Sequence, residues 1–165
     1  MSLTTTHIFN FTTKTKANEW QIVNDGVMGG KSSSTLQVSG KGHGIFTGHI
    51  SLANNGGFAS VRHNPNFEGV KKYKQIVLKL KGDGKNYQFR LKAASQQRQS
   101  YVQEFSTNGE WQEIKLNIAD FSPQFRGRKL DIPNFNFNEL AEIAFLIGNK
   151  KEQDFKLIID QISIQ

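Results

Sequence analysis

Short segments in which apolar and polar residues alternate recur along the chain, and glycine, asparagine or proline separates them. About ten such segments at regular spacing are typical of an all-β protein, because a strand that buries one face alternates with a period of two. Only residues 138–142 suggest a helical turn. Nearly continuous apolar runs at 141–147 and 155–164 suit the central strands of a sandwich. We therefore expect one antiparallel β-sandwich or jelly-roll domain over residues 1–165.

Positive charge is concentrated in one segment. The whole sequence has 21 basic and 14 acidic residues, and residues 69–101 alone contain nine basic residues and one acidic residue. The rest of the chain is therefore almost neutral. A local field of this kind either belongs to a solvated outer face or attracts an anionic partner.

The alternation in residues 73–81 and 86–94 predicts two neighbouring strands, joined as a hairpin by a turn at residues 82–84. The outward positions of this hairpin are basic and would form one surface: Lys79, Lys81, Arg90 and Lys92. Such a surface either maintains solubility or steers an acidic partner. Because the outward positions carry no pattern of aromatic residues for base stacking, we expect no nucleic-acid partner.

Two loops rich in glycine and asparagine, residues 24–32 and 54–58, lie close together in the sequence. Residues 54–57 are expected to form a hairpin loop between strands at 43–52 and 58–63. The loops are either ordinary tight turns or a shaped binding surface at one end of the sandwich. In the second case the candidate binding residues are Asn24, Asp25, Met28, Gly29, Gly30, Asn54, Asn55 and Arg62.

Residues within these loops are expected to hold them in shape. Asp25 and Asn54 have short polar side chains beside glycine, and such side chains commonly bond nearby backbone N–H groups. Gly29 and Gly30 are expected to need backbone geometry that other residues cannot adopt. We therefore predict structural roles for Asp25 and Asn54, and no catalytic role.

A third candidate surface is the irregular segment 121–137, which contains four phenylalanines and the Arg126-Gly127-Arg128 triplet. Aromatic residues and arginine are enriched at protein interfaces, so Phe125, Arg126 and Arg128 are candidate binding residues. Alternatively, the phenylalanines pack a long loop onto the sandwich.

Enzyme chemistry finds little support in the sequence. The chain has no cysteine, which excludes disulfides and thiol catalysis. His43 and His49 share a strand face but stand about 20 Å apart at strand rise, too far to bind one metal ion. A nucleophile elbow, a phosphate loop and a recognisable pair of carboxylates are also missing. We expect no enzyme activity, no metal and no cofactor, although a calcium site with oxygen ligands stays open.

The termini and hydropathy bear on location. A run of about 18 apolar residues, which a membrane span would need, does not occur. The first residues show neither a secretory signal nor an arginine-rich transit peptide. The sequence therefore predicts a soluble, cytoplasmic protein.

Several multi-residue blocks resemble those of the complex I intermediate-associated protein 30 family. They are Trp20, NDGVMGGKS at 24–32, Phe46 with Gly48, NNGGFASVR at 54–62, GDGKNY at 82–87, FSPQFRGR at 121–128 and FKLIIDQI at 155–162. The resemblance implies a galactose-binding-domain-like β-sandwich and a non-enzymatic, chaperone-like role, since mitochondrial relatives assist assembly of NADH:ubiquinone oxidoreductase. Ala144 and Asn149 replace a glycine and an acidic residue usual in the family. The compact chain suggests a bacterial protein.

Two functions from different classes therefore stand. One is a protein-interaction or assembly module that uses the loops and the Phe/Arg segment. The other is a carbohydrate- or small-ligand-binding module. An exposed Trp or Tyr platform beside the loops would favour a sugar, and a broad apolar patch would favour a protein.

Overall fold

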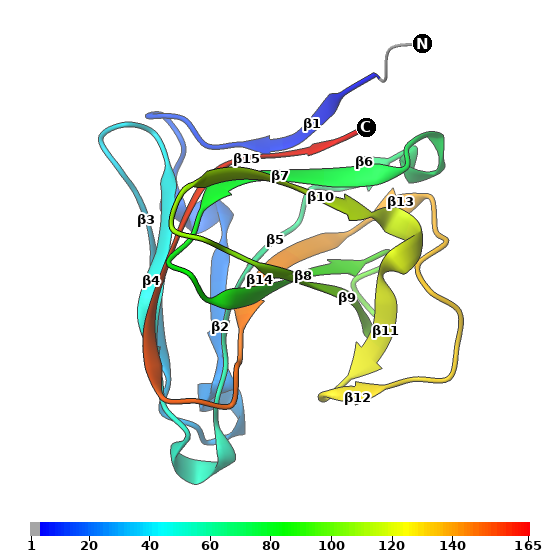
Figure 1. Ribbon diagram of the computed structural model, residues 1–165. Coiled ribbons are helices and arrows are strands. Elements are labelled where there is room, and N and C mark those ends of the chain that lie inside the picture. Colours follow the sequence, from blue (N-terminus) through cyan, green and yellow to red (C-terminus); the bar gives the residue numbers. More distant parts are fainter. Residues whose placement is uncertain (1–3) are drawn as a thin grey trace.

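The computed structural model describes residues 4–165, without the side chains of Val27 and Met28. Two antiparallel sheets pack face to face, and a short two-stranded ribbon lies at one end (Figure 1). The six-stranded sheet contains β10 (Trp111–Asn117), β7 (Gln75–Lys81), β15 (Gln153–Ile164), β4 (Gly44–Ile50) and β3 (Ser33–Val38), with β1 (Thr6–Asn10) paired to β15. The seven-stranded sheet runs in the order β12 (Arg128–Lys129), β11 (Ser122–Phe125), β9 (Ser100–Ser106), β8 (Asn86–Lys92), β14 (Glu142–Ile147), β5 (Ala59–His63) and β2 (Gln21–Asn24).

Short elements complete the fold. The ribbon pairs β13 (Glu139–Leu140) with β6 (Phe67–Glu68). Single 3-10 turns are η1 (Ala17–Glu19), η2 (Asp25–Met28), η3 (Ala53–Asn55), η4 (Val70–Lys72) and η5 (Ile118–Asp120). Residues 4–165 contain no α-helix, so the expected all-β sandwich is confirmed. Within the same residues, no helix is long and apolar enough to cross a membrane.

The long strand β15 connects several parts of the six-stranded sheet. Its first residues pair with β4, and its last residues lie between β7 and β1. The change of partner coincides with a register shift between Ile159 and Gln161, where a bulge bends the strand. The apolar run that predicted a central strand therefore corresponds to β15, which has a neighbour on each side over its second half.

The core lies between the inward faces of the two sheets and is rich in phenylalanine. Phe89 and Phe145 are fully buried and meet edge to face with ring centres 4.9 Å apart. Phe46 meets Phe155 in the same manner at 4.8 Å. Aromatic pairs in this geometry add to the stabilisation from buried area. The period-two pattern of the sequence identifies the inward residues of β7 and β8 correctly, since all of these are buried: Ile76, Leu78, Leu80, Tyr87, Phe89 and Leu91.

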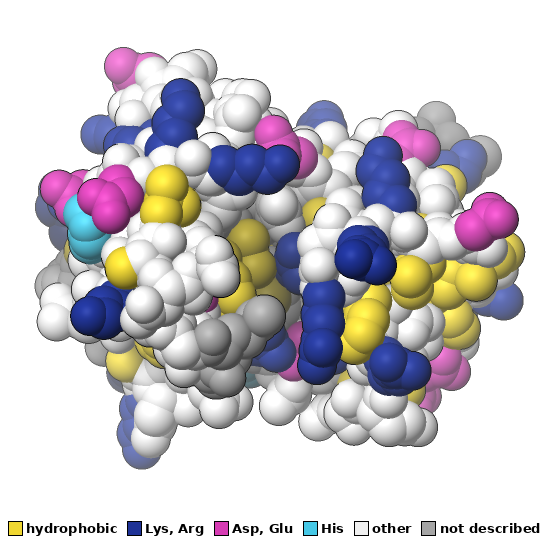
Figure 2. All heavy atoms as spheres, turned by 90° about the horizontal axis from the view of Figure 1, so that it is seen from below, with side chains coloured by type: hydrophobic (Ala, Val, Ile, Leu, Met, Phe, Trp, Pro, Cys, Tyr) yellow, Lys and Arg dark blue, Asp and Glu magenta, His cyan; other side chains and the backbone are white. Residues whose placement is uncertain are grey.

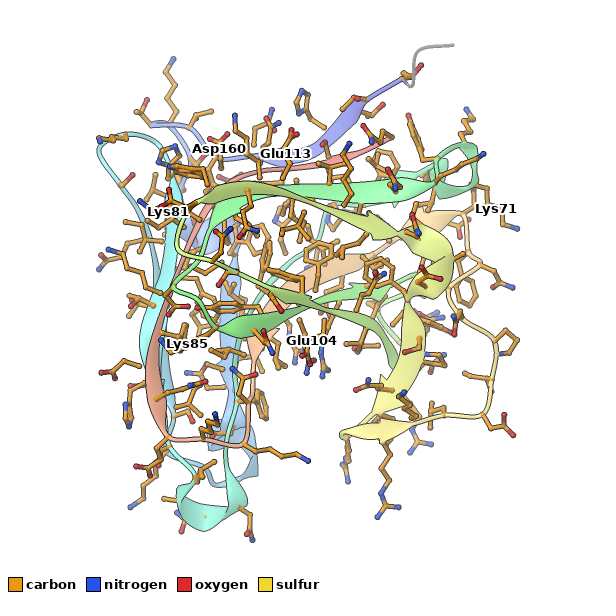
Figure 3. All side chains as sticks on the ribbon, viewed as in Figure 1. Lys71, Lys81, Lys85, Glu104, Glu113 and Asp160 are labelled. Atoms are coloured by element: carbon orange, nitrogen blue, oxygen red, sulfur yellow. The ribbon has the colours of Figure 1, made fainter. Side chains whose placement is uncertain are left out.

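The predicted hairpin of residues 73–81 and 86–94 is wrong. β7 belongs to the six-stranded sheet and β8 to the seven-stranded sheet, so the turn between them crosses from one sheet to the other. Figure 3 shows this separation: Lys81 lies on the six-stranded sheet, and Lys85, just past the turn, lies below it. The expected hairpin at residues 54–57 is wrong for the same reason, because β4 and β5 also lie in different sheets. Two strands that each have one apolar face and are joined by a glycine-rich turn can either pair within one sheet or stack in opposite sheets. The sequence pattern is the same in both cases.

The four basic residues of that segment consequently do not form one surface. Lys79 and Lys81 lie on the outer face of the six-stranded sheet, where Lys79 is 3.6 Å from the Asp160 carboxylate. Arg90 and Lys92 lie on the outer face of the seven-stranded sheet. The single basic surface of the sequence prediction is therefore two separate surfaces.

Candidate binding surface

Asp25 joins the two glycine loops, residues 24–32 and 54–58. Its carboxylate accepts hydrogen bonds from the Ser32 N–H at 2.9 Å, the Ser32 hydroxyl at 2.6 Å, the Gly57 N–H at 2.6 Å and the Phe58 N–H at 3.3 Å. The residue is 1% exposed. Burial alone would raise the pKa of Asp25, but these hydrogen bonds outweigh burial and hold the pKa below its ordinary value. Asp25 is thus a charged anchor for both loops.

The glycines beside this carboxylate leave room for it. A Cβ atom at Gly30 would stand 2.4 Å from Asp25 Cγ, and one at Gly56 would stand 2.4 Å from Asp25 Oδ2. Gly29 ends η2 in the left-handed region with φ of +88°. The Asn54 amide donates to the Gly29 carbonyl at 3.1 Å. The loops therefore have one packed arrangement, in which glycine is required for close approach at Gly30 and for backbone conformation at Gly29.

The remaining loop candidates have less defined roles. The Asn24 side chain accepts a hydrogen bond from the Ser34 hydroxyl at 2.7 Å. Asn55 is exposed with a positive φ of 61°. The side chain of Met28 lies outside the part of the chain that the structure describes. Binding by these loop residues stays a prediction.

The outer face of the seven-stranded sheet is hollowed, and we call it the groove. The sheet arches between β2 and β5 on one side and β11 and β12 on the other (Figure 1). Viewed from below, this face is a depression with Lys and Arg side chains on both sides (Figure 2). Ala144, Leu146 and Val102 are 2%, 6% and 5% exposed but do not belong to the core cluster. They face outward from the sheet, and their low exposure means that neighbouring side chains cover them.

The outward residues of the seven-stranded sheet form the floor of the groove, and the strand register arranges them in rows. One row crosses five strands through Gln21, Arg62, Ala144, Arg90 and Val102. The adjacent row contains Val23, Ser60, Leu146, Gln88 and Glu104. On the other side of the first row, Lys92 is paired with Glu142. Two arginines therefore flank one alanine at the centre of the floor.

Charged groups at this centre interact closely. Arg62 Nη1 lies 4.0 Å from Glu142 Oε1, and the Arg90 guanidinium donates to Gln88 Oε1 from Nε at 3.0 Å and Nη2 at 2.8 Å. Burial and the positive charge of Arg62 lower the pKa of Arg90 to about 10, and the charge of Glu142 partly offsets this. The two guanidinium groups therefore repel one another within a partly buried site.

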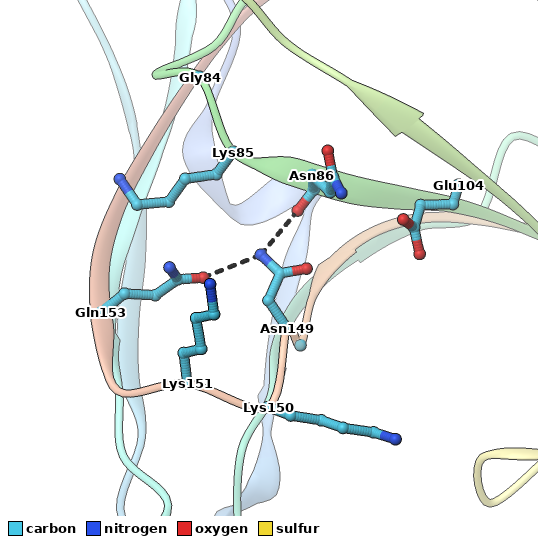
Figure 4. Close-up of a pocket in the computed structure, with 9 residues that line it drawn as sticks. Gly84, Lys85, Asn86, Glu104, Asn149, Lys150, Lys151 and Gln153 are labelled. Carbon is cyan, nitrogen blue, oxygen red and sulfur yellow. Dashed lines mark hydrogen bonds between the residues drawn. The ribbon is translucent and has the colours of Figure 1, made fainter.

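Two open hollows adjoin the floor. One, of about 490 Å³, is lined by Gly84, Lys85, Asn86, Glu104, Gly148, Asn149, Lys150, Lys151 and Gln153. The Asn149 amide holds its wall by donating to the Asn86 carbonyl at 3.1 Å and to Gln153 Oε1 at 2.8 Å (Figure 4). The second, of about 330 Å³, lies beside β11 and is lined by Gln88, Val102, Gln103, Glu104, Asp120, Ser122, Gln124 and Lys129. Glu104, which stands in the second row of the floor, lines both hollows, so the two hollows meet at the floor.

The Phe/Arg segment forms one edge of the groove. Phe121 and Phe135 are buried at 0% and 3% exposure, which agrees with packing of this segment onto the sandwich. Phe125 lies beneath two guanidinium groups, with Arg98 Cζ 4.8 Å and Arg126 Cζ 5.3 Å from the ring centre. Arg126 and Arg128 are exposed at the turn between β11 and β12. This segment therefore packs onto the sandwich through its buried phenylalanines and exposes its arginines at the edge of the groove.

The structure brings some predicted residues together and separates others. Arg62 and Arg90, predicted for different surfaces, lie in the same row of the groove. Several groove residues were not among the candidate binding residues: Lys85, which was counted only in the basic segment, and Gln88, Glu104, Glu142, Lys150 and Lys151. They were missed because only the order of strands in the sheet shows which outward residues are neighbours.

Neither feature proposed to distinguish a sugar from a protein ligand lines the groove. Both tryptophans and all three tyrosines fall within residues 4–165, and none of them faces the groove. Trp20, Tyr87 and Tyr101 are buried, and Trp111 lies on the six-stranded sheet with its ring centre 4.9 Å from that of His43. Among the described residues, the exposed large apolar side chains are Leu52, Trp111 and Ile132, and none of them lines the two hollows of the groove. The groove is charged and polar.

The described residues show no cluster of metal-ligating side chains. Within residues 4–165, no three His, Asp or Glu side chains lie close enough to hold a metal ion. The His49 ring bonds Asp154 at 2.8 Å and the His43 ring lies 3.5 Å from Asp160, so these two histidines pair with different carboxylates. The fold and the groove define the class of protein: a galactose-binding-like β-sandwich with an open, basic face.

The sequence comparisons name the family. The profile of the family described as Complex I intermediate-associated protein 30 (CIA30) matches residues 9–159, and the chain belongs to this family. The relative named Complex I intermediate-associated protein 30, mitochondrial, from Drosophila melanogaster is 26% identical over 186 residues, with 96% of this chain and 62% of the relative covered. The probable counterpart from Caenorhabditis elegans is 25% identical, with 94% and 53% covered. The chain thus spans less than two thirds of these relatives.

Solved structures with the same fold are carbohydrate-binding modules. A family 11 module of a cellulosomal cellulase from Clostridium thermocellum superposes with a TM-score of 0.72 at 13% identity, covering 99% of this chain and 95% of the module. A family 29 module gives a TM-score of 0.58 at 14% identity, covering 98% and 87%. At this identity the similarity shows the jelly-roll fold alone.

The relatives also correct the expected location and source. Their names place them in mitochondria, which contradicts the cytoplasmic location predicted from the sequence. The curated relatives come from animals, so they give no support to the expected bacterial origin. The missing leader features were weak evidence because a leader is a separate segment from the folded domain that these residues form.

Proposed function

We propose that this chain is a non-catalytic protein-binding domain that acts as an assembly factor for respiratory complex I in mitochondria. The observation that carries the proposal is the family match, which extends over nearly all the strands of the sandwich. We further propose that residues 1–165 act as one domain. Its partners would then be subunits or assembly intermediates of the complex.

We propose that the groove is the surface that contacts the partner. It is a hollowed face whose charged groups are directed outward from a sheet, which suits recognition of a protein surface. Arg62 on the floor and Arg126 with Arg128 at the edge would make direct contacts. Asn24, Asp25, Met28, Gly29, Gly30, Asn54 and Asn55 would shape the adjoining loops.

The second candidate function is binding of a carbohydrate or another small ligand. The fold of the solved modules favours it, and one of them is in complex with a β-1,3-1,4-mixed-linked tetrasaccharide. Sugar rings usually stack on aromatic side chains, and the described tryptophans and tyrosines do not face the groove. Protein binding is therefore the better-supported proposal.

The test is deletion of the gene in its native host, followed by measurement of assembled complex I on native gels. We expect the complex to decrease and a smaller intermediate to accumulate, and expression of the wild-type chain to restore assembly. Unchanged complex I after deletion would contradict the proposal. Binding of the mixed-linked tetrasaccharide by the purified chain, with normal complex I in the deletion strain, would support the second candidate.

A further inference from the structure

The central row of the groove places two guanidinium groups on either side of a small residue. Arg62 on β5 and Arg90 on β8 are both register partners of Ala144 on β14. Neighbouring strands are about 4.8 Å apart, so the two arginine backbones are separated by about 10 Å. Ala144 has only a methyl group and is 2% exposed, so the longer side chains around it cover it. Arg62 approaches Glu142 and Arg90 bonds Gln88, and these two partners lie on opposite sides of the central row, so each guanidinium is placed to contact a separate carboxylate of a ligand.

The charges at this position are not balanced within the protein. Glu142 is the one carboxylate within 4.0 Å of either guanidinium among the described residues, and it approaches Arg62. Arg90 donates two hydrogen bonds to the neutral Gln88 side chain. A guanidinium has five N–H donors, so donors remain for a ligand. Burial and, after it, the positive charge of Arg62 lower the pKa of Arg90, so a nearby anion would favour its charged form.

Basic residues also surround the floor. Lys85, Lys150 and Lys151 line the larger hollow, and Lys129 lines the smaller one. Arg126 and Arg128 extend the positive charge along the edge. Glu104 and Glu142 interrupt it on the floor. This mixed pattern suits a ligand with separated negative charges better than the continuous phosphate backbone of a nucleic acid.

We infer that the groove binds an acidic polypeptide segment, and that carboxylates of this segment contact Arg62 and Arg90 on either side of Ala144. The inference rests on the proposed function, because it names the chemistry of the partner that an assembly factor would hold. Lys150, Lys151 and Lys129 attract further carboxylates of the segment, whereas Lys85 is already paired with Asp83. The aromatic ring described at the edge of the groove, that of Phe125, is already covered by the guanidinium groups of Arg98 and Arg126, which disfavours stacking of a base or a sugar on it.

The test measures binding of a defined peptide to the purified chain. The probe is a fluorescein-labelled peptide of alternating Glu and Ser, about eight residues long, since an extended chain of this length crosses the sheet at about 3.3 Å per residue. Affinity is measured by fluorescence anisotropy at low and high salt. The groove variant is Arg62→Gln with Arg90→Gln. The control variant, Lys79→Gln with Lys81→Gln, removes the same charge from the six-stranded sheet.

We expect the groove variant to bind the peptide roughly tenfold or more weakly, because each charge-assisted hydrogen bond is strong, and the control variant to bind like the wild type. Arg62→Lys keeps the charge but loses the planar pair of donors, and it should weaken binding several-fold. Melting temperatures of all variants are compared with the wild type. Equal weakening in the groove and control variants would overturn the inference, since a general field would then explain binding.

Two more results would overturn it: no peptide binding by the wild type at low salt, or tighter competitive binding by oligothymidine of equal charge. These outcomes are separate from a failure of the proposed function. If deletion of the gene impairs complex I and the groove variant restores it fully, the assembly role stands and the acidic-segment site is wrong. If deletion has no effect on complex I, the assembly role is wrong whatever the peptide does.

Discussion

At the scale of single residues, Asp25 shows how one buried charge can organise distant parts of a chain. Its carboxylate receives four hydrogen bonds from residues on two loops, and the adjacent glycines leave space for it. A buried carboxylate with this many donors is stable as the anion. Removing it leaves backbone N–H groups without acceptors, which costs more than the loss of one bond.

We predict that Asp25→Ala lowers the free energy of unfolding by about 2–4 kcal/mol, because several buried donors lose their acceptor. Urea unfolding measures the change. Asp154→Ala, which removes an exposed carboxylate with 89% side-chain exposure, is the control and should change little. A loss no larger than that of the control would show that the loops are held by other contacts.

The same carboxylate predicts a dependence of stability on pH. The pKa of Asp25 is lower in the folded protein than its ordinary value of 3.8. Its contribution to stability is therefore complete above pH 3.8 and disappears as pH falls through the lower folded value. In Asp25→Asn, the free energy of unfolding measured with urea should fall less than in the wild type between neutral and acidic pH. An equal fall in both proteins would contradict the assignment.

Gly30 and Gly26 provide a matched pair within one loop. A Cβ at Gly30 meets Asp25 Cγ at 2.4 Å, whereas a Cβ at Gly26 meets nothing within 4 Å. We predict that Gly30→Ala destabilises by about 1–3 kcal/mol through overpacking, and Gly26→Ala by less than about 0.5 kcal/mol. Thermal unfolding of both variants tests this. Equal melting temperatures would mean that the loop relaxes to accept the methyl group.

At the scale of elements, the turns that cross between sheets determine where the charged strands lie. The turn after β7 is fixed by Asp83, which accepts from the Lys156 N–H at 2.8 Å, the Tyr87 hydroxyl at 2.9 Å and Lys85 Nζ at 3.1 Å. The next crossing turn, after β9, contributes Thr107, whose hydroxyl donates to the Lys85 carbonyl at 2.8 Å. The two crossings therefore support one another at the same edge of the sandwich.

Loss of Asp83 should weaken this edge. We predict that Asp83→Ala lowers the free energy of unfolding by about 2–3 kcal/mol, because Tyr87 is 1% exposed and its hydroxyl would lose its acceptor. Asp131→Ala, at an exposed position, is the control. Hydrogen exchange should show faster exchange in β8 and the start of β15 than in the rest of the core. Stability equal to that of the Asp131 variant would refute this role.

At the scale of the whole molecule, the sandwich separates two sets of basic residues. Lys79 and Lys81 face outward from one sheet, and Arg62, Arg90 and Lys92 face outward from the other. The core lies between them, so the two surfaces meet different partners or solvent. Surface fields are screened over about 8 Å at physiological salt, so each surface acts mainly on what approaches its own side.

We therefore predict that Lys92→Glu slows association with the acidic peptide, whereas Lys79→Glu leaves the rate nearly unchanged. Stopped-flow fluorescence at low and high salt measures this, and added salt should slow the wild type and the Lys79 variant similarly. The Lys92 variant should respond less to salt. Equal slowing in both variants would show that the net charge of the protein, and not the groove, steers the peptide.

Much of the site was accessible to sequence analysis one piece at a time. The glycine loops, Arg62 and the arginines at 126 and 128 were identified from local composition, and Asp25 was correctly expected to hold its loop. Glu142 and Glu104 were missed because an acidic residue on an outward strand position is common. Its importance depends on the strands beside it, which local composition does not reveal.

The sequence by itself determined the all-β class, the inward face of most strands, the positions of the turns and the family, since these depend on a local period of two and on short blocks of residues. Only the tertiary structure decided which strands pair and which stack. A strand with one apolar face can bury it in either arrangement, and the choice depends on the packing of the whole core. In the observed arrangement, Arg62 and Arg90 lie beside Ala144 on the seven-stranded sheet, and Lys79 lies on the six-stranded sheet at the opposite side of the sandwich.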